Sequence, residues 1–275
     1  MATFPEALSG YDAGTPANNT PAGSDSVGTQ LDDHLRDIKA NIKLVYQLAC
    51  TTISVVVFTS SGTWTKPANL LYALVEVQGG GGGGGGVANP GTDEAGAGSG
   101  GAAGGYARKL LLAAALGSTE TVTVGAAAAG GSSSDGTDGN VSTFALASGT
   151  NVVGNGGSGG RSGTAVSTIA REHGVAGGTA TGGDINIRGN GSAAAVMFGG
   201  TVVGSSQAIG IASAGGSSYF GGAPQGYAQE STDLDGIAGL TGSGGSGGAS
   251  GDTGGAATGG AGGAGLVVVT QYLSS

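Results

Sequence analysis

The sequence has few of the cysteines that cross-link small domains and lacks the long apolar runs that span a membrane. It holds one cysteine, Cys50, in 275 residues, which excludes an internal disulfide framework. Aromatic residues make up 5% and charged residues 10% of the chain, and no segment approaches the roughly 18 consecutive apolar residues of a membrane-spanning helix. Residues 1–10 also lack a basic segment followed by an apolar one, so we expect a soluble protein that the usual signal does not export.

The charge and the scarcity of metal-binding residues exclude further classes. The formal net charge is −9 and no run of Lys and Arg is present, which argues against binding to nucleic acid or to an anionic membrane surface. The two histidines, His34 and His173, have no cysteine or second histidine at metal-ligand spacing. Glycine patterns of the nucleotide-binding kind are unavoidable at this composition. We therefore expect no metal and no cofactor.

Glycine is what the chain has in abundance, and all but five of its 64 glycines follow residue 78. They begin with eight in a row, Gly79–Gly86. Such a run is either a flexible linker or a set of polyglycine-II helices that touch closely because no Cβ separates their backbones. The glycines keep no strict every-third register, which excludes collagen, and the low charge disfavours disorder. We therefore expect an ordered region of packed polyglycine-II helices.

Two segments precede the glycine region. Residues 1–24 contain three prolines among small polar residues and are expected to be an extended arm, either disordered or docked on a larger assembly. Residues 25–50 are expected to form a short coiled-coil collar, because apolar residues there alternate spacings of four and three. Isoleucine at both seam positions favours a homotrimer over a dimer. One amphipathic helix lying on its own domain is the alternative. The seam residues are Leu31, Leu35, Ile38, Ile42 and Val45.

Residues 51–275 are expected to form one mainly β and irregular domain of short strands and polyglycine-II helices. Ile53–Thr59 and Leu70–Gln78 suit a hairpin-like pair, and Leu266–Leu273 should pair with one of them. Trp64 is expected to be a packing anchor. Further strands are expected at Tyr106–Leu112, Thr119–Gly125, Val141–Ala147 and Asn151–Gly154.

A series of short motifs follows in this region: Phe58–Pro67, Val75–Gln78 before the glycine run, Gly104–Ala107, Gly182–Gly189, Ser217–Gly222, and Gly259–Gly265 before Leu266–Val269. In this order they resemble the glycine-rich C-terminal domain of bacteriophage tail fibres and adhesins. Together they cover about residues 53–275, and Asp25–Lys43 is similar to a helical segment near the N-termini of such fibre proteins.

The resemblance implies a structural virion protein and not an enzyme. In such adhesins stacked polyglycine-II helices form a rigid slab whose connecting loops recognise bacterial surface receptors. The expected partners are therefore a bacterial surface glycan or outer-membrane protein, further copies of the chain, and other phage tail or baseplate proteins that contact residues 1–24. The protein would be made in the host cytoplasm and would act at the host cell surface.

Two chemically varied segments, Arg161–Val175 and Pro224–Leu234, are the predicted receptor-binding sites, because recognition must come from side chains that interrupt a bare slab. In the alternative interpretation they are solvated turns, and another loop such as Val87–Ala95 forms the tip. The candidate residues are Arg161, Arg171, Glu172, His173, Gln225, Tyr227, Gln229, Glu230 and Asp233.

Two other functions remain open from the sequence. A tail-spike-like polysaccharide depolymerase could draw paired carboxylates from Glu230, Asp233 and Asp235. Against this, the domain has few acids and little bulk to shape a cleft. The other is a purely structural fibre or spacer protein. An ice-binding slab belongs to the same class, but it would have no use for a collar or for varied segments between glycine tracts.

Overall fold

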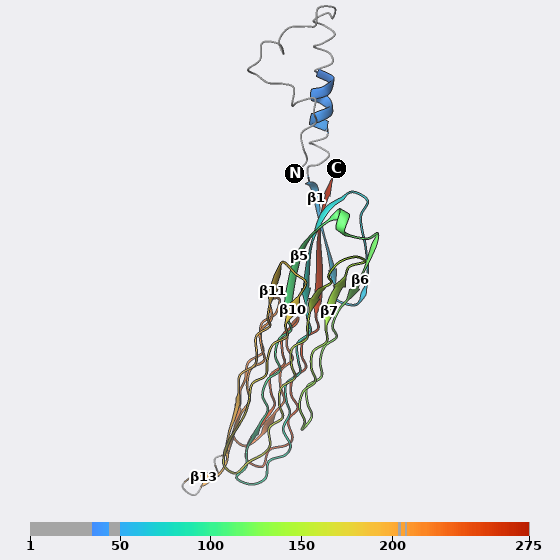
Figure 1. The fold of residues 1–275 in the computed structure, drawn as a ribbon. Helices are drawn as coiled ribbons and strands as arrows, with labels where there is room; N and C mark the ends of the chain where they lie inside the picture. Colours follow the sequence, from blue (N-terminus) through green and yellow to red (C-terminus); the bar gives the residue numbers. More distant parts are fainter. Residues whose placement is uncertain (1–34, 44–49, 203–204, 207, 275) are drawn as a thin grey trace, which may run out of the picture.

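The protein is elongated, with its helix at one end and strand β13 at the other (Figure 1). The computed structural model describes residues 35–43, 50–202, 205–206 and 208–274. We call the end near the helix proximal and the end near β13 distal. The fold is mainly β, with antiparallel sheets that do not close. Among the described residues, no helix is long and apolar enough to cross a membrane.

The proximal sheet has five strands in the order β1-β19-β3-β5-β11. The predicted strand near the C-terminus, β19, pairs with both β1 and β3. The hairpin-like pairing of β1 with β3 is therefore wrong, because β19 lies between them and the connecting loop carries a strand of another sheet. The bounds are β1 Cys50–Phe58, β3 Leu70–Gln78, β5 Tyr106–Leu112, β11 Ile185–Ile187 and β19 Leu266–Ser274.

A second five-stranded sheet, in the order β10-β8-β7-β6-β2, lies beside the proximal sheet and encloses the main core with it. Trp64 is 2% exposed and its ring centroid lies 5.8 Å from that of Phe144, which confirms its expected role as a packing anchor. A short 3-10 helix, Ala113–Ala115, follows β5. The bounds are β2 Gly62–Thr65, β6 Thr119–Thr123, β7 Ser142–Ala145, β8 Val152–Gly154 and β10 Ala180–Thr181.

Extended segments fill the region between the proximal strands and the distal end, and we call each of them a rod. The central rod is Gly79–Val87, which continues β3. Each backbone amide of the central rod donates a hydrogen bond to a neighbouring rod. Amides three residues apart donate to the same neighbouring rod. A repeat of three residues with bonds only between segments is that of a polyproline-II-type helix. The amides of residues 79, 82 and 85 donate to residues 105, 102 and 99; those of 80, 83 and 86 to 140, 137 and 134; and those of 81, 84 and 87 to 263, 260 and 257.

The central rod is surrounded so closely that a side chain has no room at any of its glycines except Gly80, where the fit would be tight. A Cβ added at any position of Gly79–Gly86 would lie between 1.9 and 3.1 Å from a backbone atom of a neighbouring rod. At Gly81 that atom is the carbonyl oxygen of Ser243, at 1.9 Å. The contacts are backbone to backbone, so no rotamer change could relieve them. The run is therefore an ordered structural element.

Smaller sheets lie among the rods toward the distal end. The largest, which we call the distal sheet, has the order β16-β15-β12-β9. Its strands are β9 Ile169–Glu172, β12 Ala195–Phe198, β15 Ile209–Ile211 and β16 Ala228–Gln229. The others are β4 Gly96–Ala97, β17 Asp233–Leu234 and β18 Ala249–Ser250 in one sheet, and β13 Thr201–Val202 with β14 Ser205–Ser206 in another.

The helix covers residues 35–43, inside the predicted collar. Leu35, Ile38 and Ile42 are each about half exposed or more. The other two seam residues, Leu31 and Val45, lie outside the described residues, as does the arm 1–24. The described helix therefore carries an apolar stripe that no other described residue covers.

We predict that Gly81→Ala destabilises the domain strongly while Gly222→Ala does not. The new methyl group at position 81 meets a backbone carbonyl, whereas a Cβ at Gly222 meets nothing within 4 Å. Forcing atoms into a packed site costs about 3 kcal/mol, which lowers the melting temperature of a domain of this size by about 6–12 °C. Thermal unfolding followed by circular dichroism measures the difference. Equal melting temperatures for the two variants would contradict the packed central rod.

Candidate functional site

The distal sheet presents an apolar outer face. On β12, Ala195 and Met197 point inward and are fully buried, so Val196 and Phe198 point outward. Strand β9 has the same alternation, with Ile169 and Arg171 on the exposed positions. Because successive residues of a strand point to opposite faces, these outward residues share one surface.

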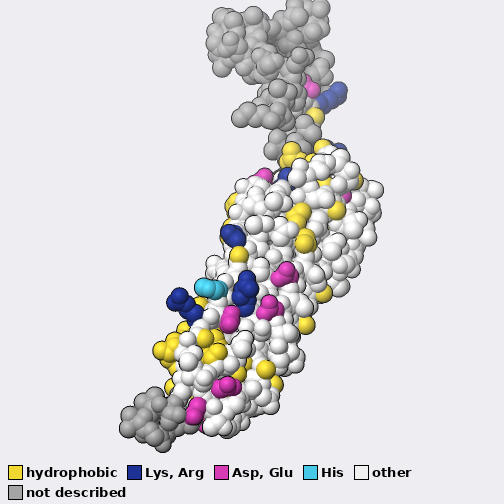
Figure 2. Space-filling view, turned by 60° about the horizontal axis from the view of Figure 1, so that its bottom comes forward, with side chains coloured by type: hydrophobic (Ala, Val, Ile, Leu, Met, Phe, Trp, Pro, Cys, Tyr) yellow, Lys and Arg dark blue, Asp and Glu magenta, His cyan; other side chains and the backbone are white. Residues whose placement is uncertain are grey.

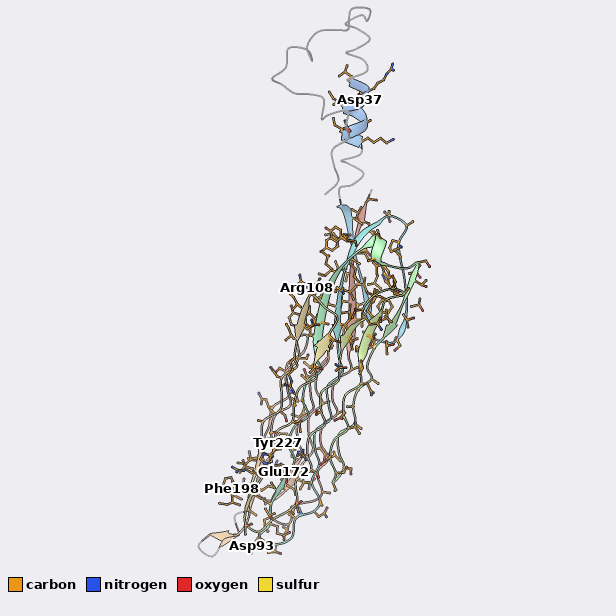
Figure 3. The ribbon with its side chains drawn as sticks, in the orientation of Figure 1. Asp37, Asp93, Arg108, Glu172, Phe198 and Tyr227 are labelled. Atoms are coloured by element: carbon orange, nitrogen blue, oxygen red, sulfur yellow. The ribbon has the colours of Figure 1, made fainter. Side chains whose placement is uncertain are left out.

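The register of the sheet assembles those residues into two rows. Phe198 lies between Ile169 and Ile209 in one row. Val196 lies between Arg171 and Ile211 in the next. The result is an apolar strip with a guanidinium at one edge. Figure 2 shows hydrophobic side chains gathered near the distal end beside basic and histidine side chains, and Figure 3 shows Phe198 and Glu172 there.

The first predicted segment contributes to this face only in part. Arg171 and Glu172 lie in β9 itself, and His173 follows it as an exposed residue. Arg161 lies on a separate rod. There it lines an open hollow of about 440 Å³ together with Asp135 and Asp138. The segment therefore supplies two different surfaces.

The carboxylates of that hollow are engaged with the backbone of the neighbouring rod. Asp138 accepts a 2.7 Å hydrogen bond from the amide of Gly159. Asp135 accepts one of 2.7 Å from the amide and one of 3.0 Å from the hydroxyl of Ser162. These bonds hold two rods together and explain why acids occur there.

The second predicted segment reaches the distal sheet at its opposite edge. Gln229 lies in β16, which is three strands from β9, or roughly 14 Å at ordinary strand spacing. Gln225 and Glu230 are exposed beside β16, and Gln229 accepts a 3.0 Å hydrogen bond from Thr232. The sheet therefore places the two segments at opposite edges. The register sets Gln229 opposite Gly210 on the inner side, so Ala228 is the residue of β16 beside the apolar strip.

The other predicted residues of this segment hold rods together. The Tyr227 hydroxyl donates to the backbone carbonyls of Asp235 and Gly247. Burial raises the pKa of Tyr227 to about 12; a hydrogen bond with Ser246 opposes the shift and the charge of Asp235 adds to it. Asp233 accepts a 3.0 Å hydrogen bond from the amide of Gly255.

Two of the three carboxylates considered for glycoside cleavage, Asp233 and Asp235, have similar structural bonds, while Glu230 is exposed. Asp235 accepts a 2.7 Å hydrogen bond from the amide of Thr258, as Asp233 does from Gly255. Each bond joins a loop to the last glycine tract. Two carboxylates used in this way have a structural explanation that needs no substrate.

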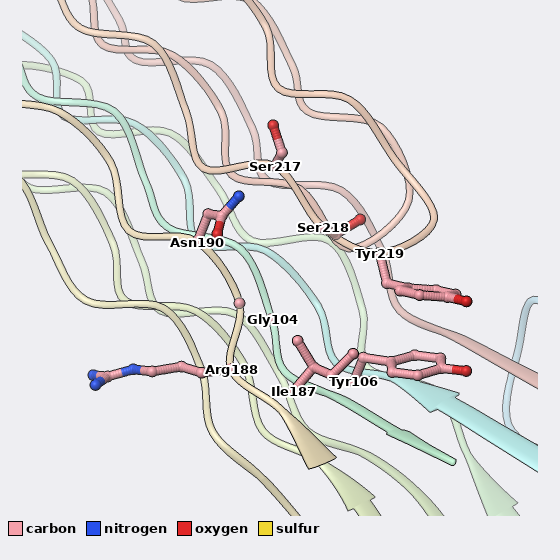
Figure 4. A pocket seen from close by; sticks show the side chains of 9 residues that line it. Gly104, Tyr106, Ile187, Arg188, Asn190, Ser217, Ser218 and Tyr219 are labelled. Carbon is pink, nitrogen blue, oxygen red and sulfur yellow. The ribbon is translucent and has the colours of Figure 1, made fainter. Parts of the chain in front are cut away.

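A smaller hollow, of about 130 Å³, lies where β5 passes into the rods (Figure 4). Tyr106 stacks on Tyr219 there with ring centroids 4.0 Å apart, and Arg188 points away from both rings. The Tyr106 hydroxyl donates to Glu76, and burial followed by this bond raises the pKa of Tyr106 far above its ordinary value. Both the ring and the hydroxyl of Tyr106 therefore make structural contacts where the rod meets β5.

The apolar members of the distal face were missed by sequence reasoning. Ile169 lies within a predicted segment and is 74% exposed, but Phe198 and Ile211 lie outside both segments. The sequence signal for these residues is the short alternation in Ala195–Phe198 and Ile209–Ile211. This pattern is common to all half-buried strands and does not mark a binding surface. Only the register reveals that their outer sides form one surface.

Within the described part of the chain, no group of three His, Cys, Asp or Glu side chains is placed to hold a metal ion. A family model for a glycine-rich domain matches residues 56–272. No curated protein matches the chain.

We predict that Tyr227→Phe lowers the free energy of unfolding by about 1 kcal/mol near neutral pH, because the hydroxyl no longer bonds to the two carbonyls. The pKa of Tyr227 is about 12 in the folded protein against 10.0 ordinarily, so the folded state holds the proton more tightly. The stability from this group is complete below pH 10 and is lost as the pH rises through 12.

The difference in unfolding free energy between wild type and Tyr227→Phe should therefore shrink between pH 10 and pH 12. Urea unfolding at a series of pH values measures it, and all other titrating groups are shared by the two proteins. A difference that stays constant across this range would show that the hydroxyl is not held as described.

Proposed function

The chain belongs to the family of glycine-rich domains. We propose that this member is a structural virion protein, a bacteriophage tail fibre or fibre tip that attaches to a bacterial surface receptor. One observation carries the proposal. The bundle of rods is packed by backbone and holds the distal sheet far from the helix (Figure 1). A rigid spacer with varied side chains at its free end suits attachment at a distance.

The distal face supports recognition of a bacterial surface glycan or an outer-membrane protein. Its apolar strip, with Ile169 and Phe198, offers a flat surface for a sugar ring or an apolar side chain. Arg171 at the edge can form paired hydrogen bonds to phosphate or carboxylate groups. His173, which is exposed just after β9, adds a polar contact beside it, while Glu172 lies on the opposite face of the strand. In this proposal the rods are polyglycine-II helices that keep the face rigid.

The assembly we propose is a homotrimer. Its copies would meet along the helix, and residues 1–24 would dock on other phage tail or baseplate proteins. The exposed stripe of Leu35, Ile38 and Ile42 supports this, because an isolated short helix is marginal without partners. The protein would be made in the host cytoplasm, assembled into the virion, and used at the host cell surface.

We predict that Phe198→Asp and Arg171→Glu each reduce binding of the purified chain to receptor-bearing bacteria by about tenfold or more. The first puts a charge in the apolar strip, and the second reverses the charge at its edge. Leu240→Asp is the matched control, because Leu240 is exposed and lies outside the distal sheet. Flow cytometry of labelled protein on a panel of strains, with melting curves for each variant, measures the effect.

Exchange of segments gives a second measurement of the same prediction. Replacing Arg161–Val175 or Pro224–Leu234 with the counterpart from an adhesin of different host range should change which strains are bound. A folded chimera with unchanged strain range, together with full binding by both point variants, would overturn the proposed site.

We predict that Ile38→Asp combined with Ile42→Asp weakens self-association, because both charges enter the apolar seam. The measurement is the molar mass in solution by sedimentation equilibrium at micromolar concentration. Lys39→Asp is a control on the same helix, outside the seam. A wild-type chain that sediments as a monomer would contradict the trimer.

A further inference from the structure

The proximal sheet is apolar on both faces. Its inner face belongs to the main core, where Val75, Val77, Val267 and Val269 are fully buried. On β1 both sets of alternating residues are mainly apolar. Ser54, Val56 and Phe58 lie on the core side, while the alternating residues Ile53, Val55 and Val57 point outward.

The outward residues of four neighbouring strands form three rows by register, and we call this surface the outer face. The strands are β1, β19, β3 and β5 in that order. Tyr72 and Tyr272 stack on the face with centroids 4.4 Å apart. The rows are Ile53, Tyr272, Tyr72 and Leu112; Val55, Thr270, Leu74 and Leu110; and Val57, Val268, Glu76 and Arg108.

The aliphatic side chains at both sides of the outer face are open to solvent. Each of five is more than half exposed, although they lie on the most regular sheet of the protein: Ile53, Val55, Val57, Leu110 and Leu112. An antiparallel sheet with one wet face normally alternates apolar and polar residues. Near-continuous apolar runs, such as Val55–Phe58 and Leu266–Val269, are typical of sheets buried on both faces. The outer face is therefore built to be covered.

We infer that the outer face is buried at the threefold axis of a trimer of this chain, against the outer faces of the other two copies. This inference deepens the homotrimer of the proposed function by giving it a surface in the sheet. The charges favour a copy as the occupant. The chain has a net charge of −9, so two copies repel each other overall. The outer face is an exception, because its only charged side chains are Glu76 and Arg108, one of each sign.

The connection to the helix supports the same occupant. Residues 44–49 are all that separate the helix from β1, so the exposed stripe of the helix and the outer face lie on consecutive parts of the chain. Copies that meet along the helix therefore bring their β1 strands close to one another. Residues 1–24 contain three prolines and mostly small residues, a composition that does not supply a strand-like apolar cover.

The test compares the molar masses of four full-length proteins by sedimentation equilibrium at micromolar concentrations. The face variant is Val55→Asp with Leu110→Asp, which places charges in the middle row. The control is Leu240→Asp, an aliphatic residue as exposed as Leu112 but outside the proximal sheet. The third protein is a milder face variant, Val55→Thr with Leu112→Gln, which replaces the charged face variant if that variant is unfolded at room temperature. The fourth protein is wild type.

We expect wild type and control to sediment at three times the chain mass. The association of the face variant should weaken on the order of 100-fold. A monomeric wild type, or a folded face variant that keeps the wild-type mass, would overturn the inference; the first outcome would also mean that the chain itself or another protein covers the face. Strain binding distinguishes the two proposals. A wild-type trimer that binds no strain selectively rejects only the distal receptor site. A monomeric wild type that still binds strains selectively rejects the homotrimer and the outer face as its interface, and leaves the distal receptor site standing.

Discussion

Hydrogen bonding between backbones that touch is the constraint on which this structure depends. The central rod gives its amides to three neighbouring rods, and its carbonyls accept from others, such as the amides of Gly157 and Gly245. These bonds require the chains to approach until no Cβ fits. A rod on the outside is less constrained: in residues 125–131, Ala126, Ala127 and Ala129 are exposed. Glycine content therefore reports how deeply a rod lies in the bundle.

The proximal end of the molecule is stabilised differently from the rods. The proximal sheets share a core of large apolar residues around Trp64 and Phe144. The rods have almost no such core and depend on hydrogen bonds worth about 0.5–1.5 kcal/mol each, offset by the entropy cost of ordering glycine. Gln78 joins the two regimes. It is fully buried, and its amide group donates to the carbonyl of Gly104, 2.9 Å away, at the point where β3 becomes the central rod.

The sequence was informative wherever side chains decide the structure. The strands β1, β3, β5 and β19 and the anchor Trp64 follow from apolar patterning. The neighbours of each rod could not be predicted, because a glycine carries no side chain that specifies a partner. The same limit explains the wrong hairpin: β1 and β3 each match β19 equally well in composition. At the distal end, charged residues such as Arg171 were visible as chemical variety. Phe198 was not, because its exposure depends on which strands flank β12.

The three-residue repeat also limits how such a molecule can change in sequence. Because every third amide faces the same neighbour, one inserted residue within a rod would redirect all later hydrogen bonds to the wrong neighbours. A rod can lengthen only in steps of three residues, about 9 Å each, and its neighbours must lengthen with it. The loops and small sheets at the distal end are outside this register. Residues such as Ile169 and Arg171 can therefore be replaced without altering the bundle, which makes the distal face the part of the chain that is free to vary.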